Sequence, residues 1–235
     1  MLTGRQALVT GASRGIGRAI AIALAGAGAR VTLVARGIEA LQDVAREIGS
    51  NASVAACDVS DAFAVAKLGA ALQARDASPD VLVNNAGLFP LSPLDVMDPY
   101  AFEQTIQFNL VAPFYVLRAL LPAMKANGAG HVITIGSVAD RTIFPSNGAY
   151  SASKYGQRAM HEVLRQELRG SGVRATLVSP AATDTPIWDP IDPDNRPGFP
   201  TRSSMLRPED VAEAVLWAVT RPTHVNVDEV RISSS

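Results

Sequence analysis

The sequence has few of the residues that mark disulfide frameworks, metal sites and charged binding surfaces. It contains one cysteine, Cys57, and three histidines that are not paired at ligand spacing, so we expect neither an internal disulfide nor a metal site. Charged residues make up 18% of the chain and sum to a net charge of −1. This balance gives no electrostatic reason to expect nucleic acid or an anionic membrane as a partner.

Long apolar runs are also scarce. The longest, such as residues 19–27, are too short to span a bilayer, and residues 1–6 lack the basic stretch and apolar segment of a secretion signal. A single cysteine suits a reducing compartment, and the small apolar residues 54–56 beside it predict that Cys57 is a buried core residue rather than a nucleophile. We therefore expect a soluble, cytoplasmic protein with no membrane partner.

Short apolar segments alternate with longer helical patterns along almost the whole chain. Apolar residues make up 48% of the sequence, and continuous apolar strands separated by helices are typical of a parallel sheet buried on both faces. Right-handed crossovers make such a sheet doubly wound, with a ligand crevice at the carboxyl ends of its strands. We predict a single α/β domain of Rossmann type over residues 1–235, with about seven strands flanked by helices on both faces. The predicted strands are 7–10, 30–35, 53–56, 81–83, 131–135, 174–178 and 227–232, and the predicted helices are 15–28, one ending near 48, 62–75, 99–126, 149–169 and 208–220.

One segment departs from this rhythm. Residues 186–208 contain six prolines and little periodicity, which indicates an irregular excursion over the predicted crevice. The segment could be a passive surface loop, but its place in the topology favours a substrate lid.

A glycine-rich turn follows the first predicted strand. Residues 10–17 read Thr-Gly-Ala-Ser-Arg-Gly-Ile-Gly, and glycines here allow a tight turn that brings backbone amides at a helix N-terminus close to a pyrophosphate. The spacing differs by one residue from the usual dinucleotide fingerprint, yet the strand–turn–helix context favours nucleotide binding. The turn residues expected to contact the cofactor are Gly11, Ser13, Arg14, Gly15, Ile16 and Gly17.

The end of the second predicted strand bears on which nicotinamide cofactor is bound. NAD-specific folds place a carboxylate there for the ribose 2′-hydroxyl, and that carboxylate would repel a 2′-phosphate. This chain has Val34-Ala35-Arg36 instead. Arg36 offers several donors for a phosphate, and Arg14 could add a second positive charge, although either arginine could also be a solvated surface residue. The pattern favours NADP(H).

Tyr150 and Lys154 form the most informative pair. On a helix, their four-residue spacing places both side chains on one face. An ammonium beside a phenol favours the phenolate, so we expect Tyr150 to exchange a proton more readily than its ordinary pKa of about 10 allows. Taken alone, the pair could be an ordinary amphipathic surface.

Two more elements complete a pattern. Asn84-Asn85-Ala86-Gly87 follows the fourth predicted strand, and Ser137 follows the fifth, thirteen residues before Tyr150. Together with the glycine turn and the Tyr-x-x-x-Lys pair, these elements make the chain resemble a classical short-chain dehydrogenase/reductase over almost its whole length.

The resemblance implies a role for each catalytic residue. Tyr150 would be the general acid in carbonyl reduction and the base in alcohol oxidation. Lys154 would bind the nicotinamide ribose and bias Tyr150 towards phenolate, and Ser137 would hydrogen-bond the substrate oxygen as charge develops on it. Asn109 matches the family asparagine that holds a water of the proton relay, whereas a mid-helix asparagine by itself is more often a solvent-facing poor helix former.

The resemblance also implies cofactor contacts. Ala181 stands where the family usually has glycine, and its methyl group could alter the backbone near the nicotinamide. Near the other end, Asp228-Glu229 replaces the Asp-Gly-Gly of many members and is more similar to the 3-hydroxy-acid and serine dehydrogenase-like branch than to the ketoreductases of fatty-acid synthesis. The implied contacts are Asp58 and Val59 to the adenine, Asn84, Ala86 and Gly87 to the adenosine and its ribose, and Pro180, Thr183 and Thr185 to the nicotinamide amide.

The expected reaction is reduction of a small-molecule carbonyl by NADPH. The alternatives are an alcohol or 3-hydroxy-acid dehydrogenase working oxidatively and a non-catalytic, NADP-sensing regulator; the complete set of catalytic residues argues against the regulator. Large apolar groups on several faces of helix 99–126 also predict a homodimer or homotetramer. The residues expected to line the substrate pocket are Leu88, Phe89, Arg141, Phe144, Ile187 and Trp188.

Overall fold

The computed structural model describes residues 2–235, which build a seven-stranded sheet in the order β3-β2-β1-β4-β5-β6-β7. All neighbouring strands run parallel. The predicted α/β fold with a doubly wound parallel sheet is therefore confirmed. The strands are β1 (Gln6–Thr10), β2 (Arg30–Ala35), β3 (Ala52–Ala56), β4 (Val81–Asn84), β5 (Gly130–Ile135), β6 (Val173–Pro180) and β7 (Glu229–Ile232).

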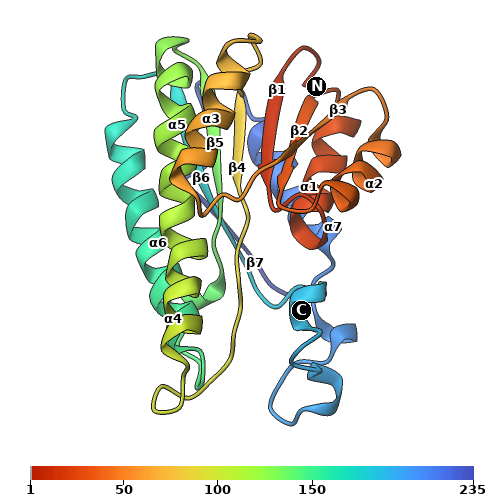
Figure 1. Cartoon of the computed structure of the whole chain (residues 1–235), viewed down its shortest axis with the longest axis vertical. Coiled ribbons are helices and arrows are strands. Elements are labelled where there is room, and N and C mark those ends of the chain that lie inside the picture. The colour runs from red at the N-terminus through yellow and green to blue at the C-terminus, as the bar shows by residue number, and fades with distance from the viewer. Residues whose placement is uncertain (1) are drawn as a thin grey trace.

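Helices cover both faces of the sheet, as Figure 1 shows. Alternate residues of each central strand point to opposite faces, so Ala7 and Val9 pack in one buried cluster and Leu8 packs in the other. The first cluster lies under α1 (Gly15–Gly26), α2 (Ile38–Ile48) and α7 (Pro208–Val219). On the other face lie α3 (Ala62–Gln73), α4 (Pro99–Ile106), α5 (Ala112–Ala126) and α6 (Gly148–Glu167).

The order of the strands reverses between β1 and β4, which lie side by side. The chain builds outward from β1 through β2 to β3, and then returns to build the other half from β4. Loops on the two sides of such a reversal diverge and leave a crevice at the carboxyl ends of the strands.

The long helix predicted over residues 99–126 is interrupted. A π-helical turn, Gln107–Val111, joins α4 to α5. The continuous helical stretch of 28 residues is long and apolar enough to cross a bilayer by length and composition, contrary to the expectation that no segment would be. It packs against α3 and α6 within the helical layer, and a packed layer helix of this kind is weak evidence for a membrane span.

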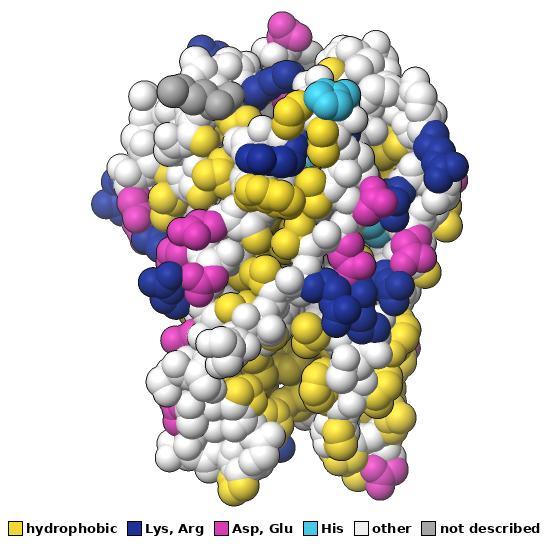
Figure 2. All heavy atoms as spheres, turned by 180° about the vertical axis from the view of Figure 1, so that it is seen from behind, with side chains coloured by type: hydrophobic (Ala, Val, Ile, Leu, Met, Phe, Trp, Pro, Cys, Tyr) yellow, Lys and Arg dark blue, Asp and Glu magenta, His cyan; other side chains and the backbone are white. Residues whose placement is uncertain are grey.

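The proline-rich segment 186–208, which we call the lid, forms three short 3-10 turns at Pro186–Trp188, Pro193–Asn195 and Arg202–Ser204. It projects beyond the carboxyl ends of the strands, opposite α4 (Figure 1). Seen from behind, the molecule is hollowed between these two projections, and hydrophobic side chains face the hollow (Figure 2). The fold thus places the irregular segment beside the crevice, as predicted.

Candidate active site

A cavity of about 1030 Å³ extends along the carboxyl ends of the strands and under the lid. Its walls include residues directly after β1, β2, β3, β4, β5 and β6. Pockets for single small ligands usually measure about 300–1,000 Å³. The cavity is thus large enough for a dinucleotide and a small substrate together.

The glycine turn forms one end of this cavity and has the backbone that the sequence pattern requires. Gly11 and Gly15 have φ values of 65° and 56°, in the left-handed region that a side chain disfavours. Gly17 does not line the cavity, because it lies where a Cβ would collide with the Gly11 carbonyl and the Asn85 amide. Gly17 therefore allows α1 to approach the strand ends and is not itself a ligand contact.

Asn85 belongs to the segment 84–87 that was predicted to support the adenosine, but it was given no role of its own; in the structure it holds the glycine turn in place. Its Nδ2 donates to the carbonyl oxygens of Thr10 at 2.9 Å and Gly11 at 3.3 Å, and its backbone N–H donates to Thr10 Oγ1 at 3.0 Å. Asn84, which was predicted to support the ribose, is buried in β4 outside the cavity, whereas Ala86 and Gly87 line it. The sequence signal for this role was the position of Asn85 directly after β4, since the carboxyl ends of the neighbouring strands β1 and β4 meet at one edge of the sheet.

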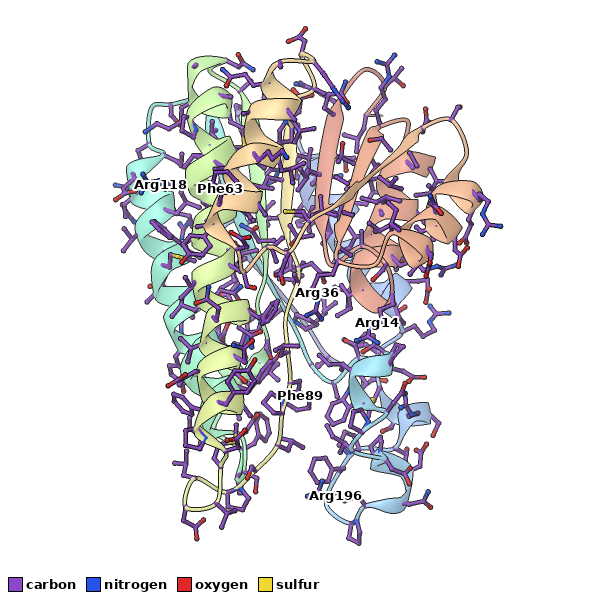
Figure 3. The ribbon with its side chains drawn as sticks, in the orientation of Figure 1. Arg14, Arg36, Phe63, Phe89, Arg118 and Arg196 are labelled. Carbon is purple, nitrogen blue, oxygen red and sulfur yellow. The ribbon has the colours of Figure 1, made fainter. Side chains whose placement is uncertain are left out.

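Two arginines give this end of the cavity a positive charge. Arg14 and Arg36 both line it (Figure 3), and neither has an ion-pair partner within residues 2–235. The Arg36 guanidinium carbon lies 5.2 Å from the centroid of the Phe108 ring, a cation–π distance that orients the group. Free guanidinium donors beside a glycine turn fit a phosphorylated nucleotide.

The predicted adenine contacts lie next to these arginines. Asp58 and Val59 line the cavity, and the Asp58 carboxylate accepts hydrogen bonds from the Ser60 N–H at 2.9 Å and hydroxyl at 2.6 Å, which fix its orientation. Cys57 lies beside them and is buried, with 8% of its surface exposed. Burial, helped by Asp58 and Asp61, raises the pKa of its thiol, which disfavours the reactive thiolate. The prediction that Cys57 is buried is confirmed, although it also contributes to the cavity wall.

The other predicted cofactor residues follow β6. Pro180, Thr183 and Thr185 line the cavity. A Cβ placed on Gly15 would lie 3.1 Å from Thr185 Cγ2, so the segment after β6 packs against the glycine turn. The donors, the charges and the glycine backbone together fit a nicotinamide dinucleotide, which these residues would hold along the strand ends.

Ser137, Tyr150 and Lys154 meet at the middle of the cavity. Ser137 begins a 3-10 turn directly after β5, and its hydroxyl accepts the Ala139 N–H at 3.1 Å. Tyr150 and Lys154 lie on the first turns of α6, with Lys154 Nζ 5.7 Å from the centroid of the Tyr150 ring.

The electrostatics of Tyr150 differ from the expectation. Burial raises the pKa of Tyr150 to about 12, the Asp140 carboxylate adds to this rise, and the hydrogen bond with Ser137 acts in the opposite direction. Burial lowers the pKa of Lys154 to about 8, against the effect of Asp140. The predicted lowering of the Tyr150 pKa is therefore contradicted, because loss of solvent outweighs the effect of the hydrogen bond with Ser137. Tyr150 is held as a protonated phenol.

Lys154 is fixed by two acceptors. Its Nζ donates to the Ile135 carbonyl oxygen and to Gln157 Oε1, both at 2.9 Å. Gln157 is buried on the next turn of α6, and it is a second residue that the sequence reasoning missed. Gln157 follows Lys154 by three residues on the same helix, and this spacing could have predicted that the two side chains are neighbours.

Asn109 is buried in the π-helical turn and does not line the cavity. Its Oδ1 accepts the Leu88 N–H at 2.7 Å, and its Nδ2 donates to the Leu88 carbonyl oxygen and to Ser153 Oγ, both at 2.9 Å. The amide thus clamps the loop after β4 to α6, which carries Tyr150. The structure shows a positioning role for this side chain, and its part in a proton relay stays a prediction.

An aromatic wall leads from Tyr150 towards the lid. The Phe89 ring lies 4.6 Å from the Tyr150 ring and 5.0 Å from that of Trp188, both edge to face. The Trp188 indole N–H donates to the Thr183 carbonyl at 3.1 Å. The predicted pocket residues Leu88, Phe89, Phe144, Ile187 and Trp188 all line the cavity, together with Leu91, Asn147, Arg196 and Phe199, which were not predicted.

Arg141 was predicted to line the pocket, and this was wrong. Its Nε donates to Asp140 Oδ1 at 2.6 Å, and its guanidinium also pairs with Glu229. Asp140 is fully buried and also accepts the Ser179 hydroxyl at 2.9 Å. A buried carboxylate needs such a partner. Arg141 is therefore held by ion pairs to the loop after β5 and to β7, away from the cavity.

Comparisons with known proteins agree with this site. The family model described as short chain dehydrogenase matches residues 5–196. The chain is 35% identical over 233 residues to an uncharacterized oxidoreductase of Staphylococcus aureus (strain MW2), which covers 99% of this chain and 98% of that protein. It is 37% identical over 237 residues to a glycine betaine reductase of Emericella nidulans, where the match covers 98% of this chain and 19% of that protein.

Solved structures give the same result. A metagenomic short-chain oxidoreductase in complex with NADP has a TM-score of 0.86 and 38% identity, covering 100% of this chain and 98% of its own. The closed form of a serine dehydrogenase complexed with NADP+ has a TM-score of 0.89 and 33% identity, covering 97% of this chain and 94% of its own. The protein is therefore an oxidoreductase that belongs to the classical short-chain dehydrogenase/reductase family.

Proposed function

We propose that this protein is an NADPH-dependent carbonyl reductase, which converts a ketone, keto ester or keto acid to a secondary alcohol. One observation carries the proposal. The Tyr150 phenol lies with Ser137 between a cavity arm that holds two free arginines and an arm lined by aromatic rings. Such an arrangement brings a proton donor to the junction of a cofactor site and an apolar substrate site.

The cofactor arm favours NADPH over NADH. Gly11 and Gly15 would hold the pyrophosphate against the N-terminus of α1. Arg14 and Arg36 would bind the 2′-phosphate, which NADH lacks. When bound, NADPH supplies the hydride that reduces the carbonyl carbon.

The chain's own residues handle the proton and the developing charge. Ser137 and Tyr150 donate hydrogen bonds to the carbonyl oxygen, and they stabilise it as it becomes an alkoxide. An alkoxide is a stronger base than a phenolate, so Tyr150 then gives up its proton despite its raised pKa. Lys154, still largely protonated at neutral pH with a pKa of about 8, stabilises the phenolate that remains.

Oxidation of an alcohol is the second candidate. Relatives of similar fold include proteins named serine dehydrogenase and alcohol dehydrogenase, and the chemistry is reversible. In that direction Tyr150 must first lose its proton, and a pKa near 12 makes this costly at neutral pH. We propose the reductive direction because Arg14 and Arg36 favour NADP(H) as the cofactor.

A substrate panel tests the proposal. Wild type and Tyr150→Phe are assayed with ketones, keto esters and keto acids for oxidation of NADPH and NADH, while NADPH binding is followed by fluorescence. We expect turnover with NADPH that falls by about 100-fold or more in the variant, because the proton donor is lost, with cofactor binding retained. Equal turnover by both proteins would contradict the mechanism. If the wild type binds NADPH but reduces no carbonyl, the proposal fails, and alcohol oxidation becomes the reaction to assay.

A further inference from the structure

The lid brings one uncompensated positive charge to the cavity. It contains three arginines, two of which are paired: Arg202 donates to Asp184 and Asp189 at 2.6 Å each, and Arg207 donates to Asp210 at 2.7 Å. The third, Arg196, has no ion pair and donates no side-chain hydrogen bond within the described part of the chain, residues 2–235. Its charge is therefore available to a ligand.

Acids close to Arg196 in the sequence are turned to other partners. Asp192 accepts hydrogen bonds from Asn195 Nδ2 at 3.0 and 3.1 Å. Asp194 accepts the backbone N–H of Arg202 at 2.8 Å. Arg202 and Arg207 thus each pair with an acid close to them in the sequence, whereas Arg196 does not.

Arg196 also has a defined place in the cavity. Its guanidinium carbon lies 4.9 Å from the centroid of the Phe199 ring, and both residues line the cavity. The Phe199 ring lies 6.3 Å from that of Trp188, which continues the aromatic wall that begins at Tyr150. Figure 3 shows Arg196 at the far end of the lid from Arg14 and Arg36, with Phe89 between them.

The charges along the cavity divide by position. Arg14, Arg36 and Asp58 lie at the cofactor end, and Lys154 lies at the catalytic centre. Among the described lining residues, Arg196 is the one charge in the substrate arm, and it is positive. A guanidinium matches a carboxylate with paired hydrogen bonds, and the aromatic wall suits an apolar body beside it.

The opposite wall has a further polar group without a partner. Asn147 precedes α6, lines the cavity and is 4% exposed. Its Oδ1 has no hydrogen-bond partner in the part of the chain that the structure covers. This oxygen can only accept a hydrogen bond, and a simple keto acid offers no donor, so Asn147 plays no part in the inference below.

We infer that the substrate is a keto acid in which an apolar segment separates the reacting carbonyl from a carboxylate, and that Arg196 binds this carboxylate. The inference rests on the proposed carbonyl reductase activity and specifies its substrate class. The carbonyl lies at Ser137 and Tyr150, the apolar segment lies along Phe89 and Trp188, and the carboxylate reaches the lid. Arg196 thereby becomes a specificity determinant that also draws the lid onto the substrate.

Matched substrates test this inference. Wild type, Arg196→Gln, Arg196→Lys and Arg207→Gln are assayed with NADPH on 4-acetylbenzoate, on its methyl ester, and on straight-chain methyl keto acids of increasing length with their esters. We expect the wild type to favour at least one acid over its ester in kcat/KM by about tenfold or more, as befits a hydrogen-bonded charge pair. Arg196→Gln should lower this acid-to-ester ratio by about tenfold through KM, and Arg196→Lys should restore part of it. Arg207→Gln, which removes a lid charge outside the cavity, should leave the ratio unchanged.

The outcomes separate the two proposals. If the wild type reduces esters and neutral ketones in a Tyr150-dependent way but favours no acid in the series, the keto-acid inference is overturned while the reductase stands. An acid-to-ester ratio that is the same in wild type and Arg196→Gln also overturns it. If no acid, ester or ketone is reduced, the proposed reductase itself has failed.

Discussion

Two buried histidines predict how the protein responds to acid. His131 on β5 and His161 on α6 are each 2% exposed. Thr176 donates its hydroxyl proton to the Val227 carbonyl at 2.6 Å and lies 2.7 Å from His131 Nε2, so its oxygen must accept the Nε2 proton. The other ring nitrogen, Nδ1, is then unprotonated, and no residue in the described chain partners it. His131 is therefore buried as a neutral ring.

Burial lowers the pKa of His131 to about 3, with Arg174 and His161 adding to the effect. Burial also lowers the pKa of His161 to about 4, where Arg165 adds to the effect and Asp228 opposes it. An unfolded histidine titrates near 6.5, so below that pH the unfolded chain takes up protons that the native protein excludes. Stability from these groups is complete above pH 6.5 and is lost as the pH falls towards 4. At pH 5 each histidine lowers the free energy of unfolding by about 2 kcal/mol, and the pair lowers it by about 4 kcal/mol. This is a large fraction of the about 5–15 kcal/mol by which a folded protein is typically stable.

Urea denaturation followed by circular dichroism at pH 7 and pH 5 measures this loss. His131→Gln and His161→Gln remove one titrating group each, and we expect the stability difference between the two pH values to shrink by about 2 kcal/mol in each variant. The exposed His224 provides the matched control, since His224→Gln should leave the difference unchanged. The variants can be less stable at pH 7 without affecting the test, because only the change with pH is compared. A pH difference as large in both variants as in the wild type would refute the reasoning.

Two further predictions concern Arg36 in the cofactor arm and Gln157 beside the catalytic Lys154. Arg36→Ala should raise KM for NADPH by about tenfold or more while KM for NADH changes little, because only the 2′-phosphate loses a partner; equal effects on both cofactors in steady-state kinetics would contradict this. Gln157→Leu removes an acceptor from Lys154 Nζ and so disfavours the buried ammonium. The alkaline limb of the kcat profile should then move to lower pH, with Gln157→Glu moving it the other way, and superimposable pH profiles would show that Gln157 does not act on Lys154.

Much of the fold follows from patterns within short stretches of sequence. Apolar runs and helical periodicity located every strand of the sheet and its helices, since burial on both faces leaves little choice of side chain. The π-helical turn at Gln107–Val111 could not be predicted in this way. It places Asn109 against Leu88 and Ser153, which are distant in sequence, and no local periodicity encodes those contacts.

The candidate site shows the same division. Spacing alone brought Tyr150 and Lys154 to one face of a helix, because helical geometry is local. The pKa of Tyr150 depends on how completely the surrounding segments remove water from it, and no local sequence pattern measures that. The predicted lowering of the Tyr150 pKa was therefore wrong, although both residues lie on one helix as their spacing predicted. Asn85 likewise acts through contacts with a turn 74 and 75 residues earlier in the chain.

The roles of the arginines near the pocket depend on where each one finds an acid. Arg141 follows Ser137 closely in sequence and was the natural choice for recognising an anionic substrate, but its guanidinium pairs with the fully buried Asp140 carboxylate. That pairing removes Arg141 from the pocket and, through Glu229, ties β7 to the loop that carries Ser137. Within residues 2–235 Arg196 has no such ion pair, because the acids near it in the sequence bind Arg202 and Asn195 instead. The cation left for the substrate is thus on the lid, where binding an anion would also close the site.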